Sequence, residues 1–142
     1  MSKQENLREF DSLSFPPTDE PIHALHVDDD GSLADLVKTF LEQERENITV
    51  VTETAVEDGM TVLENNSIDC VISDYEMPVQ DGLDFLDLVR DEYPDLPFIL
   101  FTGKGDEEIA SEAITAGVNE YLQKGTGTDQ YTVLANRIEN LV

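Results

Sequence analysis

The sequence predicts an α/β protein with a doubly wound, five-stranded parallel sheet flanked by five helices. Short apolar runs rich in β-branched residues alternate with longer amphipathic stretches along the chain. The third run is almost continuously apolar, as in parallel strands that are buried on both faces. A Pro and an Asp-Gly pair follow this run and mark a loop. Strands that alternate with helices in this way form a parallel sheet with helices on both of its faces.

A polar segment, residues 1–20, precedes the first predicted strand and is expected to form an extended arm. The chain has 142 residues, enough for one domain with a real core but not for two. Residues 21–142 are therefore expected to form that domain. Its first strand is predicted at 22–27 and its first helix over 32–44, where apolar residues recur at helical spacing.

The other predicted elements continue the alternation. Tyr93-Pro94 ends the third helix, and Gly117 is the expected cap of the fourth. The remaining strands are predicted at 48–52, 68–73, 97–101 and 119–123, and the remaining helices at 55–65, 82–91, 107–116 and 129–141.

Every predicted strand except the second is followed by a polar residue: Asp28 and Asp29, Asp74, Thr102 and Lys124. In a doubly wound sheet these residues meet at one edge, where such sheets hold their ligands. Three carboxylates can bind Mg²⁺, and a hydroxyl and an ammonium beside them suit a phosphoryl group. Asp74 can act as the nucleophile, because a carboxylate can form an acyl phosphate. The residues alone therefore indicate transient phosphorylation of an aspartate.

The same residues carry a resemblance to a known family. From about residue 21 to residue 142 the chain resembles the receiver domain of two-component response regulators, which implies a flavodoxin-like fold. The matching motifs are His26-Val27-Asp28-Asp29, Ser73-Asp74-Tyr75-Glu76-Met77-Pro78 with Asp81-Gly82, Thr102-Gly103, and Tyr121-Leu122-Gln123-Lys124.

The resemblance implies a role for each residue at the strand ends. Asp74 would accept the phosphoryl group from a sensor histidine kinase. Mg²⁺ would be bound by Asp29, Asp74 and the backbone carbonyl of Glu76, with Asp28 helping. The domain would be no enzyme beyond hydrolysis of its own acyl phosphate.

The resemblance also implies a switch. Thr102 would shift toward the phosphoryl group, which Lys124 would contact, and Tyr121 would turn inward behind it. The face made by the fourth helix, fifth strand and fifth helix would then change for a downstream protein or domain, or for a homodimer. The domain could act alone or as the N-terminal receiver of a larger hybrid protein. One departure from the family is Gly125, which follows Lys124 where a proline is usual and puts the aim of Lys124 in doubt.

A second family is compatible with part of the sequence. The segment from Asp28 to Leu33 also resembles the signature of haloacid-dehalogenase-type phosphatases, with Asp28 as the nucleophile and Asp30 as the general acid. That family needs a further acidic motif at the end of a later strand, and none follows Lys124. It also leaves Asp74 without a role, so the receiver is the favoured interpretation.

The charge of the chain limits its partners and its setting. There are 32 acidic residues against 8 Lys and Arg, a formal net charge of −24. Such a surface repels nucleic acid phosphates and anionic membranes, so direct binding to either is not expected. Self-repulsion of this size is screened in strong salt, which favours a halophilic protein. No apolar stretch approaches the roughly 20 residues of a membrane helix, and a cytoplasmic location is expected.

Overall fold

The computed structural model describes residues 20–103 and 107–142, so almost all of the polar arm expected at residues 1–20 lies outside the described residues. All ten predicted elements are present, within about two residues of their expected bounds. They are β1 (Ile22–Val27), α1 (Gly31–Glu44), β2 (Ile48–Glu53), α2 (Val56–Asn65), β3 (Cys70–Ser73), α3 (Gly82–Glu92), β4 (Phe98–Thr102), α4 (Glu107–Ala116), β5 (Glu120–Gln123) and α5 (Asp129–Leu141).

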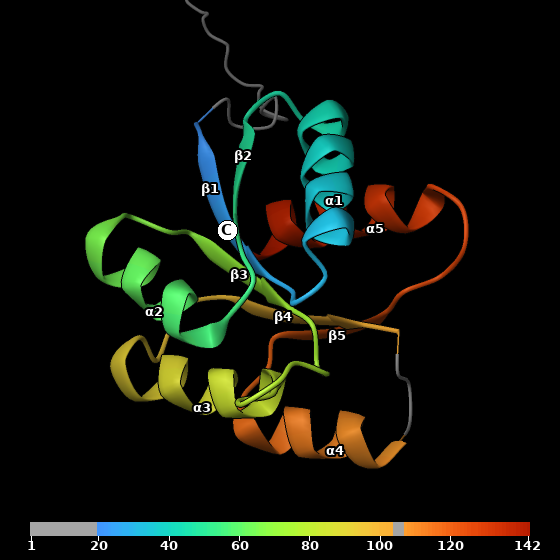
Figure 1. The fold of residues 1–142 in the computed structure, drawn as a ribbon. Coiled ribbons are helices and arrows are strands. Elements are labelled where there is room, and N and C mark those ends of the chain that lie inside the picture. Colours follow the sequence, from blue (N-terminus) through green and yellow to red (C-terminus); the bar gives the residue numbers. More distant parts are fainter. Residues whose placement is uncertain (1–19, 104–106) are drawn as a thin grey trace, which may run out of the picture.

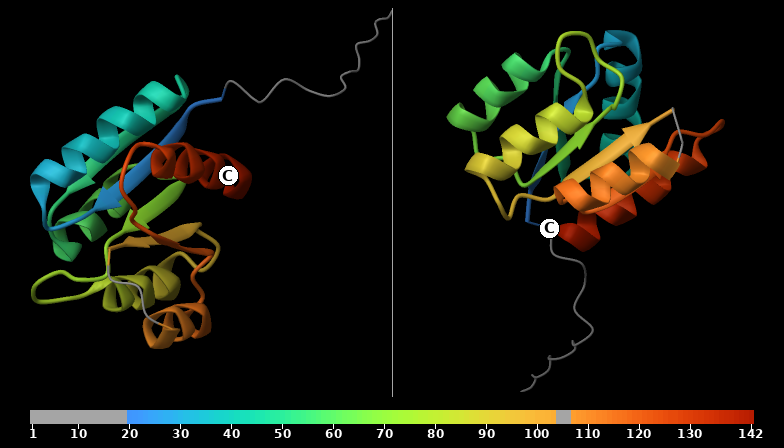
Figure 2. Two further views of the ribbon diagram at one scale, coloured as in Figure 1. Left: turned by 90° about the vertical axis from the view of Figure 1, so that its right-hand side faces the viewer. Right: turned by 90° about the horizontal axis from the view of Figure 1, so that it is seen from below.

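The five strands form one parallel sheet in the order β2-β1-β3-β4-β5 (Figure 1). Helices α1 and α5 cover one face, and α2, α3 and α4 cover the other (Figure 2). The chain moves outward from β1 to β2 and then crosses back to β3. This reversal leaves a crevice at the carboxyl ends of β1 and β3, where open α/β sheets bind their ligands.

Side-chain alternation along the strands divides the core into two layers. On β1, Ile22 and Ala24 pack under α1 and α5, whereas Leu25 and Val27 pack on the side of α2 and α3. The central strands β3 and β4 are buried at every position. This explains their continuous apolar sequence, because each residue has a helix above it on one face or the other.

Local capping fixes the starts of the two helices that follow the site loops, and also the end of α4. The carboxylate of Asp30 accepts from the N–H of Leu33 at 3.1 Å and begins α1. Asp81 and Asp84 form a reciprocal capping box at the start of α3. Gly117 ends α4 with a φ of +98°, as its expected role as a cap requires. The loops that carry the site are thus anchored at the helices that follow them.

None of the helices in the described ranges is long and apolar enough to cross a membrane.

Candidate functional site

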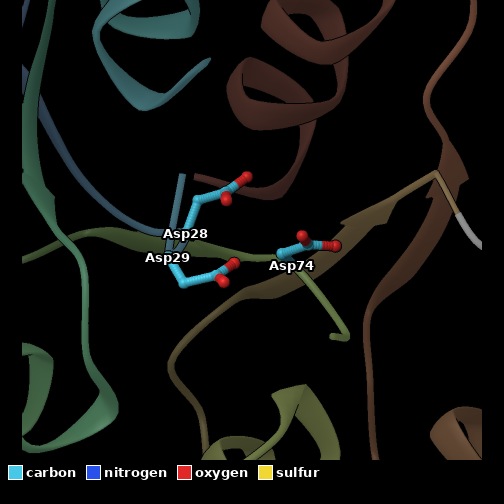
Figure 3. A group of neighbouring side chains, drawn as sticks. All are labelled: Asp28, Asp29 and Asp74. Atoms are coloured by element: carbon cyan, nitrogen blue, oxygen red, sulfur yellow. The ribbon is translucent and has the colours of Figure 1, made fainter. Parts of the chain in front are cut away.

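Three carboxylates meet in the crevice at the ends of β1 and β3. Asp28 and Asp29 follow β1 directly, and Asp74 follows β3 (Figure 3). One oxygen from each of the three carboxylates lies within 4.8 Å of the others. Their exposure is graded: Asp28 is buried, Asp74 is partly buried and Asp29 is exposed. The donor set therefore consists of hard oxygen ligands and is open to solvent on one side, which fits a partly hydrated Mg²⁺.

Lys124 reaches this cluster from the far edge of the sheet. Its Nζ lies 3.0 Å from Asp28 Oδ2 and 3.5 Å from Asp74 Oδ2. The side chain crosses the ring of Phe101, with the Nζ 5.8 Å from the ring centroid. The cluster holds three carboxylates and only one ammonium, which pairs with Asp28 and Asp74, so negative charge remains in excess. A divalent cation would relieve the repulsion between the carboxylates.

The backbone orients the two oxygens of Asp74 differently. Oδ1 accepts from the N–H of Tyr75 at 2.7 Å, whereas Oδ2 faces Lys124. The N–H of Asp74 donates to Val27 O at 3.1 Å, so the residue continues the pairing of β3 with β1. Gly82 permits a close approach from α3, because a Cβ there would lie 2.3 Å from Asp74 O. Asp74 is thus held from three directions, with one carboxylate oxygen facing the ammonium.

The other predicted residues surround the cluster. Thr102 is the buried last residue of β4, and its carbonyl accepts from the N–H of Lys124 at 2.8 Å. Tyr121 is partly buried and packs against the core layer under α3 and α4. Glu76 is exposed and shares a surface hollow with Asp29. These placements are compatible with the predicted switch and metal roles, which stay predictions.

The geometry disfavours the phosphatase interpretation. A general acid at Asp30 would need a carboxyl group free to protonate a leaving group beside Asp28. Instead, Asp30 caps α1 through the N–H of Leu33, and its own N–H donates to Asp28 Oδ1 at 2.9 Å. Asp28 is 1% exposed and is paired with Lys124, so an incoming phosphate ester has better access to Asp74.

Sequence reasoning did not anticipate the environment of His26. This residue lies on β1 two positions before Asp28, on the same strand face, and is fully buried. Among the described residues, neither of its ring nitrogens has a hydrogen-bond partner. Burial is the main cause that lowers the pKa of the imidazole from 6.5 to about 4; the charge of Lys124 also lowers the pKa, and that of Asp74 opposes the change. A neutral, buried ring therefore lies two residues before Asp28, the partner of Lys124, on the same face of the strand.

The strand order and the acid cluster at the β1/β3 crevice define a flavodoxin-like α/β domain with an acidic site where the strand order reverses. The family model of the response regulator receiver domain matches residues 24–136. The chain belongs to this family and is a receiver domain of the two-component type.

Similar proteins support this assignment. The response regulator SaeR of Staphylococcus aureus is 32% identical over 120 residues, which are 84% of this chain and 50% of SaeR. A response regulator receiver domain protein from Clostridium thermocellum is 31% identical, with a TM-score of 0.73 over 84% of this chain and 94% of its own. The response regulator TrrA of Thermotoga maritima, solved in complex with Mg²⁺-BeF, is 26% identical, with a TM-score of 0.74 over 85% of this chain and 99% of TrrA. The chain spans about half the length of the curated relatives it matches.

Proposed function

We propose that Asp74 accepts a phosphoryl group from a sensor histidine kinase, with Mg²⁺ held by Asp28, Asp29, Asp74 and the backbone carbonyl of Glu76. The observation that carries this proposal is the position of Lys124. Its ammonium lies 3.5 Å from Asp74 Oδ2 and faces a cluster of three carboxylates. A nucleophile, a cation and a set of metal ligands therefore converge at the carboxyl ends of β1 and β3.

The transfer forms one bond and breaks another. Asp74 Oδ2 attacks the phosphorus atom as the bond between phosphorus and the histidine nitrogen of the kinase breaks, and that nitrogen keeps the electron pair. The N–H of Tyr75 holds Oδ1 at 2.7 Å and so directs Oδ2 toward the incoming group. Lys124 stabilises negative charge on the phosphoryl oxygens, and Mg²⁺ supplies further charge neutralisation when bound. Thr102 supplies a hydroxyl donor at the end of β4.

Phosphorylation would then shift a conformational equilibrium. An acyl phosphate on Asp74 would bring its oxygens to the Thr102 hydroxyl and strengthen the existing contact with Lys124, which lies 3.5 Å from the unmodified carboxylate. Only such differential contacts can favour one state. Since Tyr121 lies on the neighbouring strand and packs toward α3 and α4, movement of Thr102 would reach the face formed by α4, β5 and α5. A downstream protein or domain, or a second copy of this chain, would recognise that face.

The proposed setting is the cytoplasm of a halophilic organism. The net charge of −24 supports this setting, because strong salt screens the repulsion between the acidic side chains. The same charge opposes contact with nucleic acid or anionic membranes. The relatives of about twice the matched length support a receiver that belongs to a larger protein, although a separate receiver would carry the same site. We propose no catalytic activity beyond hydrolysis of the acyl phosphate.

Intact mass spectrometry tests the acceptor. The protein is incubated with acetyl phosphate and Mg²⁺ in strong salt, together with the variants Asp74→Asn and Asp28→Asn. A single labile phosphoryl adduct on the wild type that is absent from Asp74→Asn is the expected result. An adduct that survives Asp74→Asn but is lost in Asp28→Asn would support the phosphatase alternative and contradict the proposal.

A further inference from the structure

The loop that carries Lys124 into α5 contains two glycines and no proline. Its sequence is Lys124-Gly125-Thr126-Gly127-Thr128, and a Cβ at either glycine would meet no atom within 4 Å. The space that a side chain would occupy at these two positions is therefore open. Glycine also has the largest backbone freedom of any residue, so such a loop needs another restraint to hold one conformation.

Gln130, in the first turn of α5, supplies three hydrogen bonds to this loop. Its Oε1 accepts from the N–H of Gly125 at 3.1 Å, and its Nε2 donates to Gly125 O at 3.0 Å. The same Nε2 donates to Gly127 O at 2.8 Å. The side-chain amide thus pairs with both polar backbone groups of Gly125, as a neighbouring strand would.

These bonds fix the chain directly after Lys124. The N–H of Gly125 belongs to the peptide unit that follows the Lys124 Cα, and Gln130 holds that unit. On the other side of the same Cα, the N–H of Lys124 donates to Thr102 O at 2.8 Å. Both peptide units around Lys124 are therefore tied, one to β4 and the other to α5, and this sets the direction of its side chain.

We infer that Gln130 is a positioning residue for Lys124, and that it takes over the restraint that a proline after the lysine would give. The inference rests on the proposed function, because it assigns to Lys124 the stabilisation of the phosphoryl group. Gln130 itself touches neither Asp74 nor Asp28. It acts by holding the loop so that the ammonium stays between those two carboxylates.

Two variants of Gln130 separate hydrogen bonding from packing. Gln130→Ala removes the whole side-chain amide, and Gln130→Leu keeps most of its bulk but has neither the Oε1 acceptor nor the Nε2 donor. Both should lower the rate of phosphorylation by acetyl phosphate about fivefold, which corresponds to about 1 kcal/mol. Mg²⁺ affinity should not fall, because the ligands Asp28 and Asp74 follow β1 and β3 and a displaced Lys124 would leave their negative charge less compensated. Gln43→Ala, an exposed glutamine of α1, is the matched control and should leave both quantities at their wild-type values.

A second substitution should restore part of the loss. Gly125→Ala restricts the loop backbone and fits into open space, so the double variant Gly125→Ala/Gln130→Ala should phosphorylate faster than Gln130→Ala alone. A merely structural role for Gln130 would lower the stability without this recovery. Normal rates in Gln130→Leu together with slow rates in Gln130→Ala would indicate packing and would overturn the inference.

A spectroscopic measurement keeps the inference testable if acetyl phosphate does not label the wild type. The chain has four lysines, so ¹⁵N-lysine labelling gives a simple ammonium spectrum. The Lys124 ammonium, paired with Asp28, should give a resonance protected from exchange in the wild type and in Gln43→Ala. We expect that resonance to broaden or disappear in Gln130→Ala. An unchanged resonance would contradict the positioning role, whereas absent phosphorylation alone would count against the proposed function.

Discussion

The buried imidazole of His26 makes the stability of this domain sensitive to mild acid. The ring is fully buried and has no hydrogen-bond partner among the described residues, so protonation would place an unsolvated charge in the core. Desolvation is the main cause that lowers its pKa in the folded protein from 6.5 to about 4. The unfolded chain, in contrast, binds this proton at the ordinary pKa.

The size of the effect follows from the two pKa values. Between pH 6.5 and pH 4 the unfolded chain holds more protons than the folded one, so the free energy of unfolding decreases as the pH falls. The lowering of the pKa from 6.5 to about 4 corresponds to about 3 kcal/mol of free energy of unfolding. About 2 kcal/mol of this stability is lost between pH 7 and pH 5. Above pH 7 the contribution no longer changes, because the imidazole is neutral in both states.

Urea unfolding of the wild type and His26→Leu, at pH 7 and at pH 5 in strong salt, measures this contribution. Leucine keeps an apolar group of similar size in the layer under α1 and α5 and cannot be protonated. The wild type should lose about 2 kcal/mol more than His26→Leu between the two pH values. Equal losses in the two proteins would show that His26 is not the group responsible, and would refute the reasoning.

Three further substitutions test the backbone conformation, close packing and hydrogen bonding of the fold. Val79 is fully exposed with a φ of 73°, so Val79→Asn should raise the free energy of unfolding by about 1 kcal/mol in urea titrations. Gly82→Ala should lower it by about 1–3 kcal/mol and slow phosphorylation by acetyl phosphate, because the added Cβ would overlap Asp74 O. Arg90→Lys should lower it by about 2 kcal/mol, because a lysine cannot replace the guanidinium that joins three backbone carbonyls and the Asn119 side chain. Unchanged urea midpoints would contradict each prediction.

The order of the elements was predictable because local signals agree along the chain. Apolar runs, helical spacing and the glycine at position 117 each correspond to an observed element or end. The site was predictable for a related reason. In a parallel doubly wound sheet all carboxyl strand ends lie on one edge, so Asp28, Asp74 and Lys124 had to converge once the strands were assigned.

The contacts that support the site were not predictable, because they depend on the rotamers of single side chains. Nothing in the sequence around Gln130 indicates that its amide pairs with Gly125. Likewise, the Glu42 carboxylate accepts from the N–H of Val50 on the edge strand β2 at 2.9 Å. The Lys38 ammonium donates to the backbone carbonyl of the same Val50 at 2.6 Å. Such bonds join residues whose proximity is decided by the packing of whole elements, not by local sequence.

Chemical mapping of the phosphorylated residue tests the central claim most directly. Borohydride reduces an aspartyl phosphate to homoserine, which peptide mass spectrometry then locates after treatment with acetyl phosphate and Mg²⁺. The account predicts homoserine at position 74 alone, in amounts that fall when Lys124 is replaced by Ala, because the phosphoryl group then loses its neighbouring charge. Homoserine at position 28, or at several exposed acids of the surface, would contradict the assignment of Asp74 as the acceptor.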